Sequence, residues 1–335
     1  MTPPGPVLLT GATGFVGRAV LGALRERGYA VRALVRDPRR LPAAPGLAVV
    51  GGGLLDPAAV LAAARGCAAA IHCAADYRLA LRPVDVEPMI ATNVGGTATV
   101  LAAARQAGLG RVVHCSTVGV LAFTAAGRVC DEADVAPDPG RLAGPYKRSK
   151  WAAERLALAA AGPDLEVVVV NPSTPLGAGD GRPTPTGRVI ADFLQGRIPA
   201  TVATGLNVVD VEAVGRGHVD ALERGLSGRC YILGDRNCTL AELLGSVAAA
   251  AGRRPPRWRL PYAVALAAAW ASEGRARWGA VPPGIPLTSV RMARHPMYVD
   301  AARARTELGW DPGDLAGAVA AAVRWFDGGP ARVGT

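Results

Sequence analysis

The sequence predicts an α/β fold, in which helices cover both faces of a doubly wound parallel sheet and a smaller lobe follows towards the C-terminus. Short apolar segments alternate with alanine-rich, helix-like segments over the first half of the 335 residues, and this alternation is typical of a parallel sheet. A glycine-rich turn joins the first apolar segment to the first helix-like one. Half of the residues are hydrophobic, so the chain can build a core for one large or two modest domains.

Five strands are expected before the pattern changes near Pro172, at residues 7–10, 30–35, 68–74, 111–117 and 165–171. Helices are expected after the glycine-rich turn and, from apolar residues at helical spacing, at 57–65, 87–107 and 146–161. Beyond Pro172 the chain is rich in proline and glycine, as in a loop that enters a second region. A strand at 229–234 and helices at 240–251 and 262–272 should follow. The predicted domains are residues 1–172, with a returning segment near 204–234, and a substrate-binding lobe at 173–335.

Charge and cysteine content narrow the function classes. The formal net charge is +10, from 37 Lys+Arg and 27 Asp+Glu, and a basic surface attracts anionic partners. The sequence has no cluster of basic residues with interleaved aromatics, so nucleic-acid binding is not expected. None of the six cysteines has metal-ligand spacing, so we expect no metal, and reduced thiols in a cytoplasmic protein. The N-terminus shows no signal-peptide pattern, and no apolar stretch reaches the roughly 20 residues that span a bilayer.

The sequence TGATGFVG places three glycines between the first expected strand and the first expected helix. Gly11 permits a tight turn, Gly14 lets the backbone approach a pyrophosphate, and Gly17 lets helix and strand pack closely. The N-terminus of the helix then offers free N–H groups to phosphates. An ordinary turn also uses glycine, but the strand–turn–helix context favours a dinucleotide cofactor. The predicted contacts in this turn are Gly11, Thr13, Gly14, Phe15, Val16 and Gly17.

The end of the second expected strand bears on the choice of dinucleotide. An acid at this point binds a free ribose 2′-hydroxyl, whereas an arginine accommodates a 2′-phosphate. The sequence LVRDPRR puts Arg36 there, with Asp37 next and Arg39 and Arg40 behind. We therefore expect NADP(H) as the preferred cofactor, with NAD(H) as the alternative. In an arginine-rich chain, these side chains could equally be ordinary exposed residues.

The only two lysines of the chain lie three residues apart in GPYKRSK, whereas 35 residues are arginine. Tyr146 and Lys150 are four apart on an expected helix and so share a face. An ammonium group near a phenol lowers the phenol's pKa from its usual value of about 10, which suits a tyrosine that exchanges protons. Arginine could not replace a compact ammonium in this role. Lys147 has two interpretations, a solvated helix face or a contact to substrate or to a cofactor phosphate.

The GxxGxxG spacing and the YxxxK pair together resemble the extended branch of the short-chain dehydrogenase/reductase superfamily. The resemblance covers the whole chain and implies a Rossmann domain with a smaller C-terminal substrate lobe. It implies a catalytic hydroxyl at Thr117, beside Tyr146 and Lys150, and a supporting amide at Asn93. Related enzymes commonly carry an acid for adenine where this chain has Gly53, so the neighbouring Leu54 would contribute its amide. The remaining implied contacts are Ala74, Tyr146, Lys150, Pro172 and Ser173 for the cofactor and Asp76, Tyr77 and Ser116 for the substrate.

This combination suits hydride transfer at a carbonyl or secondary alcohol carbon, with the tyrosine exchanging the proton. Val118 and Gly119 stand where the family's sugar-nucleotide dehydratases carry an Asp–Glu pair, which disfavours dehydration. The stretch RGYAVRALVRDP resembles dihydroflavonol-reductase-like enzymes, which reduce ketones with NADPH. A further resemblance, to the hopanoid-associated sugar epimerase family, rests on AADYR, YKRSK, NPSTPLG, PTPTGRVIADFLQG, TGLNVVDVEAVGRGH and VRMARHPMY.

We therefore expect an NAD(P)(H)-dependent oxidoreductase that acts on a sugar-like, polyol or lipid-linked substrate, in hopanoid or other secondary metabolism. One alternative is a sugar epimerase that works through a transient ketone. Another is a non-catalytic regulator that senses NADP, although such proteins generally lose the tyrosine or the lysine. The expected partner is a small-molecule substrate, and assembly into a homodimer stays open.

Residues 257–279 combine an apolar, helix-like segment with aromatic and basic residues at both ends. Tyr262, Leu266 and Trp270 recur every four residues and would share a helix face. The pattern fits a helix packed in the second lobe, and it also fits weak contact with a membrane surface. The flanking residues on which both interpretations depend are Trp258, Trp278, Arg257, Arg259, Arg275 and Arg277.

Overall fold

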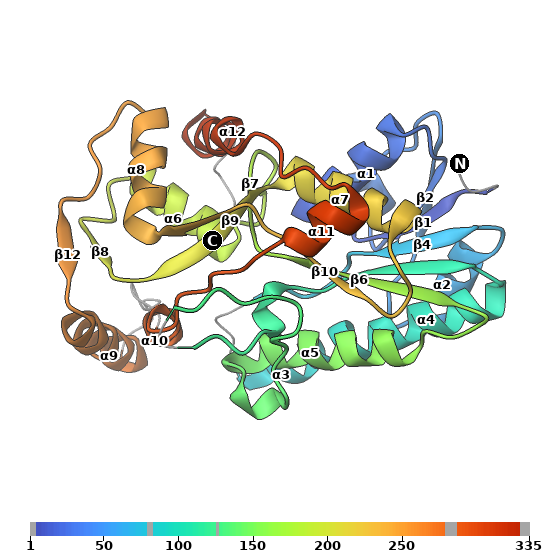
Figure 1. Cartoon of the computed structure of the whole chain (residues 1–335), viewed down its shortest axis with the longest axis horizontal. Coiled ribbons are helices and arrows are strands. Elements are labelled where there is room, and N and C mark those ends of the chain that lie inside the picture. The colour runs from blue at the N-terminus through green and yellow to red at the C-terminus, as the bar shows by residue number, and fades with distance from the viewer. Residues whose placement is uncertain (1–4, 79–82, 125–126, 279–286, 329–335) are drawn as a thin grey trace.

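A seven-stranded, wholly parallel sheet forms the centre of the molecule (Figure 1). A computed structural model of the chain describes residues 5–78, 83–124, 127–278 and 287–328. The strand order is β10-β6-β5-β4-β1-β2-β3, so the order reverses between β1 and β4, where open α/β sheets place their ligands. The strands are β1 (Val7–Thr10), β2 (Val31–Val35), β3 (Leu47–Gly51), β4 (Ala69–His72), β5 (Arg111–Cys115), β6 (Glu166–Pro172) and β10 (Cys230–Leu233).

Helices cover both faces of this sheet, as the alternating pattern predicts (Figure 1). On one face α1 (Phe15–Glu26) packs against α7 (Val211–Arg224), which in turn contacts α11 (Ala302–Leu308). On the other face lie α2 (Pro57–Ala64), α4 (Gly96–Ala107) and α5 (Gly144–Ala159). Successive strand residues point to opposite faces of the sheet, and here both sets are apolar. Leu9 joins the core under α1, and Leu8 joins the core under α4. The predicted Rossmann-type α/β fold is thus confirmed.

The prediction of a single helix at 87–107 is wrong in detail. The structure instead has α3 (Pro83–Ile90), a π-helical turn at Ala91–Gly95, and then α4. The π-helical turn adds a residue to the helical repeat and carries the buried Asn93, and such insertions are frequent at functional sites. The apolar pattern did not reveal it, because a π-helical turn of five residues is too short to change the periodicity of a 21-residue segment.

Beyond β6 the chain builds a smaller lobe around a second sheet. This sheet has the order β11-β9-β7, formed by β7 (Thr174–Leu176), β9 (Gly205–Asp210) and β11 (Arg236–Thr239). Three helices share its core: α6 (Pro185–Leu194), α8 (Leu240–Ala250) and α12 (Leu315–Gly328). Between β9 and β11 the chain returns to the large sheet through α7 and β10. The two lobes are therefore joined by more than one crossing of the chain.

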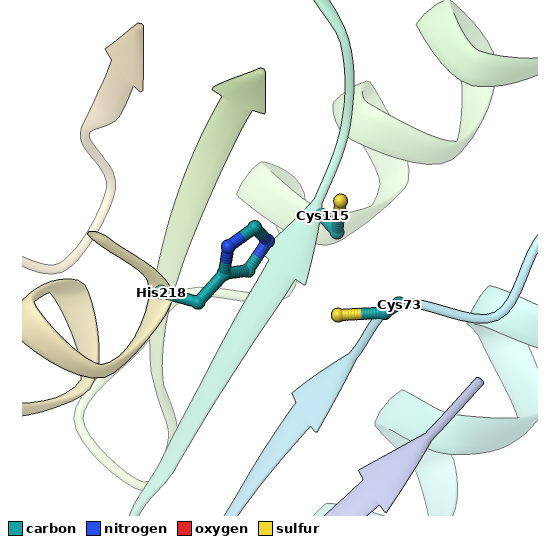
Figure 2. A group of neighbouring side chains, drawn as sticks. All are labelled: Cys73, Cys115 and His218. Atoms are coloured by element: carbon teal, nitrogen blue, oxygen red, sulfur yellow. The ribbon is translucent and has the colours of Figure 1, made fainter. Parts of the chain in front are cut away.

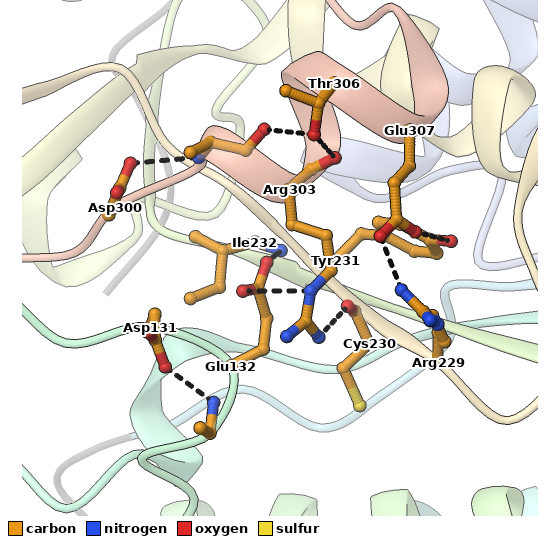
Figure 3. Close-up of polar contacts among 12 residues, drawn as sticks. Asp131, Glu132, Arg229, Cys230, Tyr231, Ile232, Asp300, Arg303, Thr306 and Glu307 are labelled. Atoms are coloured by element: carbon orange, nitrogen blue, oxygen red, sulfur yellow. Dashed lines mark hydrogen bonds and ion pairs between the residues drawn. The ribbon is translucent and has the colours of Figure 1, made fainter.

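The edge strand β10 is held to α11 by a polar cluster, shown in Figure 3. The buried Glu132 carboxylate accepts a hydrogen bond from the Ile232 amide at 2.9 Å and pairs with Arg303 at 3.6 Å. Glu307, on α11, accepts from the Tyr231 hydroxyl at 2.8 Å and from Arg229. The Glu132 side chain is 3% exposed, and this burial raises its pKa. The cluster also occupies the edge, which would otherwise be open to pairing with another chain.

The predicted helix in the 262–272 region is confirmed as α9 (Tyr262–Trp278). Ala265 and Ala269 pack against α10 (Leu287–Ala293), with Tyr262 and Leu266 at the rim. Trp270 is 53% exposed and stacks with Arg291 at 5.5 Å, and Trp258 is 74% exposed. The side chains of Arg275, Arg277 and Trp278 lie outside the described residues. Within the described part of the chain, no helix is long and apolar enough to cross a bilayer, and surface contact with a membrane stays a prediction.

Candidate active site at the carboxyl ends of β4, β5 and β6

The glycine-rich turn forms a cradle that only glycine fits. Gly11 has a φ of +80°, and a Cβ atom there would lie 2.7 Å from the Ala74 amide nitrogen. A Cβ on Gly17 would lie 2.0 Å from the Gly11 carbonyl oxygen, so β1 and α1 touch backbone to backbone. Gly14 is the N-cap of α1 and supplies no side-chain hydrogen bond to the first turn. The helix N-terminus at Phe15 and Val16, just after Thr13, therefore suits a bound pyrophosphate.

Arg36 lies exposed at the carboxyl end of β2 and forms no hydrogen bond or ion pair with the described residues. Its neighbour Asp37 is already engaged, because it accepts from Arg39 Nε at 2.9 Å and caps a short 3-10 turn. Arg36, which is predicted to meet a 2′-phosphate, thus has no carboxylate partner among the described residues, whereas Arg39 has one. The acid that could compete for a ribose hydroxyl is held by Arg39.

The place expected to receive adenine is apolar. Leu54 packs against α4, where a Cβ on Gly96 would come within 3.0 Å of the leucine. The nearby Asp56 caps α2 by accepting hydrogen bonds from the Ala58 and Ala59 amides at 3.0 and 3.1 Å. This acid therefore serves the helix, and the leucine offers only its backbone and an apolar surface to a ring.

Lys150 is anchored at the end of β5. Its ammonium donates a 2.7 Å hydrogen bond to the Cys115 carbonyl oxygen, and the side chain is buried. Tyr146 lies one turn earlier on α5, and its ring stacks on Tyr77 with centroids 4.6 Å apart. The helix thus carries the phenol and the ammonium one turn apart, with the ammonium fixed at the carboxyl end of β5.

The pKa of Tyr146 differs from the expectation. Burial raises it well above its usual value, and negative charge on Tyr77 or Cys115 would raise it further. Burial also lowers the pKa of Lys150. The prediction that Lys150 lowers the phenol pKa is therefore wrong for this geometry, because the ammonium bonds to a main-chain carbonyl. The phenol stays protonated at neutral pH, which is the form that donates a proton.

Hydroxyl groups from neighbouring strand ends lie beside this pair. The Thr117 hydroxyl accepts from the Gly119 amide at 3.1 Å, which leaves its own proton free to donate. The Ser116 and Ser173 hydroxyls are buried and have no hydrogen-bond partner among the described residues. Ser173 follows Pro172 at the end of β6. Buried polar atoms of this kind call for a partner, and a carboxamide such as that of nicotinamide would supply one.

Sequence reasoning missed Ser149, which links three elements of the site. Asn93 Nδ2 donates to Ser149 Oγ at 2.9 Å, and Ser149 Oγ donates to the Tyr146 carbonyl at 2.8 Å. The other end of the Asn93 amide, its Oδ1, accepts from the Asp76 backbone N–H at 2.7 Å. The supporting role expected for Asn93 thus has a structural basis in this network. Because this network depends on the π-helical turn that carries Asn93, sequence spacing alone could not reveal the role of Ser149.

Lys147 does not lie on a solvated helix face, so that interpretation is wrong. Its side chain is half-buried, with Nζ 3.7 Å from Met297 Sδ and 5.9 Å from the centre of the Phe123 ring. Burial lowers its pKa to about 8. Lys147 meets no carboxylate among the described residues.

The residues expected to contact substrate differ in how available they are. Tyr77 is 45% exposed and covers Tyr146. The Asp76 carboxylate is held by Arg78 through bonds of 2.8 and 2.5 Å, which leaves it less free to bind a substrate. Ser116 is buried at the end of β5.

The sequence profile of the NAD-dependent epimerase/dehydratase family matches residues 7–234, which hold every cofactor and catalytic residue named above. The chain belongs to this family. It is thus an enzyme of the oxidoreductase and epimerase group, in the extended branch of the short-chain dehydrogenases/reductases, and the family depends on a nicotinamide dinucleotide.

Relatives of this family member cover nearly its whole length. A putative dihydroflavonol 4-reductase of Synechocystis sp. is 39% identical over 325 residues, 95% of this chain and 93% of the relative. Sterol demethylase protein B of Methylococcus capsulatus is 32% identical over 324 residues, 95% and 97% of the two chains. The crystal structure of gox2253 has a TM-score of 0.83 at 39% identity and covers 96% of this chain and 98% of its own. A nucleoside-diphosphate-sugar epimerase from Pseudomonas aeruginosa has a TM-score of 0.79 at 27% identity, over 96% and 97%.

Substitutions of Tyr146 and Lys150 should impair turnover more than cofactor binding. Tyr146→Phe should leave cofactor affinity nearly intact and reduce turnover by a factor on the order of 10²–10⁴. Lys150→Arg should also be poorly active, because a guanidinium cannot fit the buried bond to the Cys115 carbonyl. Cofactor affinity would be measured by fluorescence titration and turnover with a substrate found in the labelled-cofactor assay described below. Arg148→Lys, on the exposed side of the same helix, is the control; full activity in Lys150→Arg would refute this role.

Proposed function

We propose that the protein is an NADP(H)-dependent reductase or dehydrogenase that acts at a ketone or secondary alcohol carbon of a lipid-like substrate. The proposal is carried by the Tyr146 phenol one turn from the anchored Lys150 on α5, with the Thr117 hydroxyl just beyond the end of β5. When bound, the cofactor supplies or accepts the hydride. The residues of this chain then have to orient the reacting oxygen and move one proton.

The proton chemistry follows from the contacts. Thr117, which accepts from Gly119, can donate its hydroxyl proton to the oxygen of a substrate carbonyl. Tyr146 can donate a second hydrogen bond to that oxygen and transfer its proton as the carbonyl becomes an alcohol. Tyr146 then regains its proton from solvent, and the reverse direction uses the same groups. The Asn93–Ser149 network holds the backbone of Tyr146 in register during these steps.

The surroundings of Lys147 bear on the substrate class. Phe123, Met297 and Tyr77 present aromatic and thioether surface near the predicted reaction centre, and Lys147 adds one ammonium without a carboxylate partner among the described residues. Such a lining suits an apolar framework that carries one polar acceptor. Relatives named for a dihydroflavonol and for a sterol support a polycyclic, largely apolar substrate, which is also the chemistry of a hopanoid.

A second candidate is epimerisation through a transient ketone, which the likeness to the Pseudomonas aeruginosa nucleoside-diphosphate-sugar epimerase favours. The same three residues would take the proton from the hydroxyl oxygen and return it, while a bound oxidised cofactor would accept the hydride from the carbon and give it back. The two functions differ in the fate of the cofactor. A reductase consumes NADPH, whereas an epimerase returns the hydride to the substrate.

Labelled cofactor separates the two functions. The protein would be incubated with NADPH carrying tritium at the transferring position, together with cyclic apolar ketones or sugar-like ketones. In a separate arm it would be incubated with NADP⁺ or NAD⁺ and nucleotide sugars, because an epimerase needs an oxidised cofactor to accept the hydride. We expect stoichiometric transfer of label to an apolar ketone and accumulation of NADP⁺. Inversion of a nucleotide sugar without net formation of reduced cofactor would instead establish the epimerase, and Tyr146→Phe should slow either reaction by a factor on the order of 10²–10⁴.

Cofactor preference is tested at Arg36. Arg36→Ala should weaken NADPH binding about tenfold and leave NADH nearly unchanged, because only NADPH offers a phosphate for a charge-assisted hydrogen bond. Titrating both cofactors into both proteins measures this difference. Arg39→Ala is the matched control, since its guanidinium is already paired with Asp37. If Arg36→Ala weakened both cofactors equally, the arginine would be an ordinary surface residue.

Substrate recognition is tested at Lys147. The ammonium is charged below about pH 8 and loses its proton above it, so kcat/KM should fall as the pH rises through this value. Lys147→Met should raise KM about tenfold at neutral pH and remove this step from the pH profile. Lys147→Arg keeps its charge over the whole range and should keep a low KM at high pH. An unchanged KM in Lys147→Met would exclude the contact.

A further inference from the structure

Two thiols and an imidazole converge behind the candidate active site, although the sequence spacing of these residues shows no metal-binding pattern. His72 of β4 and His114 of β5 are paired in register, so Cys73 and Cys115, the next residue on each strand, are also neighbours. His218 reaches towards them from α7, as Figure 2 shows. The two sulfur atoms and a ring nitrogen of His218 all lie within 4.8 Å of one another.

The orientation of His218 is fixed, and one of its nitrogens is left without a partner. Nδ1 lies 2.7 Å from the Val214 carbonyl oxygen, one turn back along α7, and must donate its proton to it. Nε2 then carries a lone pair, and it has no hydrogen-bond partner among the described residues although the side chain is 0% exposed. A histidine held through one nitrogen by a carbonyl, with the other free, is the arrangement that metal ligation requires.

Both cysteines are free thiols, and unlike His218 they are only half-buried. An ion could therefore reach them from the side of the predicted cofactor cleft. Tetrahedral zinc with bond lengths of about 2.3 Å to sulfur and 2.0–2.1 Å to nitrogen separates its ligand atoms by roughly 3.6–3.8 Å. The three atoms would have to close by about 1 Å at most, a change that side-chain rotation can supply.

The charge environment favours thiolates with a metal over a metal held by neutral groups. Lys150, buried nearby, donates to the Cys115 carbonyl and would repel a bare dication. Two thiolates and a neutral imidazole around a divalent ion carry no net charge, so this repulsion is removed. Soft thiolate ligands select zinc and similar thiophilic ions over magnesium or calcium.

We propose that Cys73, Cys115 and His218 form a binding site for one thiophilic metal ion, such as Zn²⁺, with a fourth position open towards the candidate active site. Binding makes two metal–sulfur bonds and one metal–nitrogen bond, and the two thiol protons leave to solvent. No electron is transferred. Cys73 is one residue from Ala74 and Cys115 is two from Thr117, so the site adjoins the predicted cofactor-binding and catalytic residues.

Cobalt binding tests this proposal without reliance on enzyme activity. The reduced full-length protein would be titrated with Co²⁺ alone, and sulfur-to-cobalt charge transfer would be followed by absorption. We expect one equivalent of Co²⁺ to bind, to give the intense bands of a tetrahedral thiolate site, and to be displaced by Zn²⁺. Cys73→Ala and Cys115→Ala should each weaken binding at least tenfold, in line with the loss of a metal ligand.

The matched control is Cys230→Ala, which removes a buried thiol outside the cluster and should bind cobalt as the unaltered protein does. His218→Gln should keep the sulfur bands at reduced affinity, and circular dichroism would verify that each variant is folded. Should His218→Gln fail to fold, the two cysteine variants decide the matter. Absence of stoichiometric binding, or binding that survives in the Cys73→Ala/Cys115→Ala double variant, would overturn the proposal.

Discussion

The hydrogen bond from the Lys150 ammonium to the Cys115 carbonyl is the contact on which the arrangement of the site depends. It ties α5 to the carboxyl end of β5, so the residue that carries the phenol and the strand that carries Thr117 are set against each other. A buried ammonium without such an acceptor would cost several kcal/mol or lose its proton. The carbonyl at a strand end is available because the ladder of the sheet stops there.

The two histidines of β4 and β5, His72 and His114, carry no charge beside Lys150. Burial lowers the pKa of His72 to about 3, with a further contribution from Lys150. His72 lies between the Thr10 and Thr97 hydroxyls, at 2.7 and 3.1 Å, which suits a neutral ring. His114, whose ring centre is 5.4 Å from that of His72, has its pKa lowered well below normal by burial. Both rings are therefore uncharged at neutral pH, and Lys150 keeps the charge.

Local sequence patterns predicted much of this structure, but they could not predict features that depend on packing between distant segments. Gly11, Gly14 and Gly17 were identifiable because strand, turn and helix follow each other directly, and Tyr146 and Lys150 because helical spacing places them on one face. The π-helical turn around Asn93 and the role of Ser149 depend on contacts between distant segments. So does the pKa of Tyr146, which follows from burial under Tyr77 rather than from its distance along the chain to Lys150.

The three cations with assigned roles differ in burial in a way that explains their chemistry. Arg36 is exposed at a strand end, where a planar, permanently charged fork can meet a phosphate. Lys150 is buried against a carbonyl, where only a compact ammonium fits. Lys147 lies between these extremes, half-buried and without a carboxylate among the described residues, so its charge is the one that pH can remove. In this arginine-rich chain, the two lysines therefore occupy positions at which a cation is buried, as Lys150 is, or half-buried, as Lys147 is.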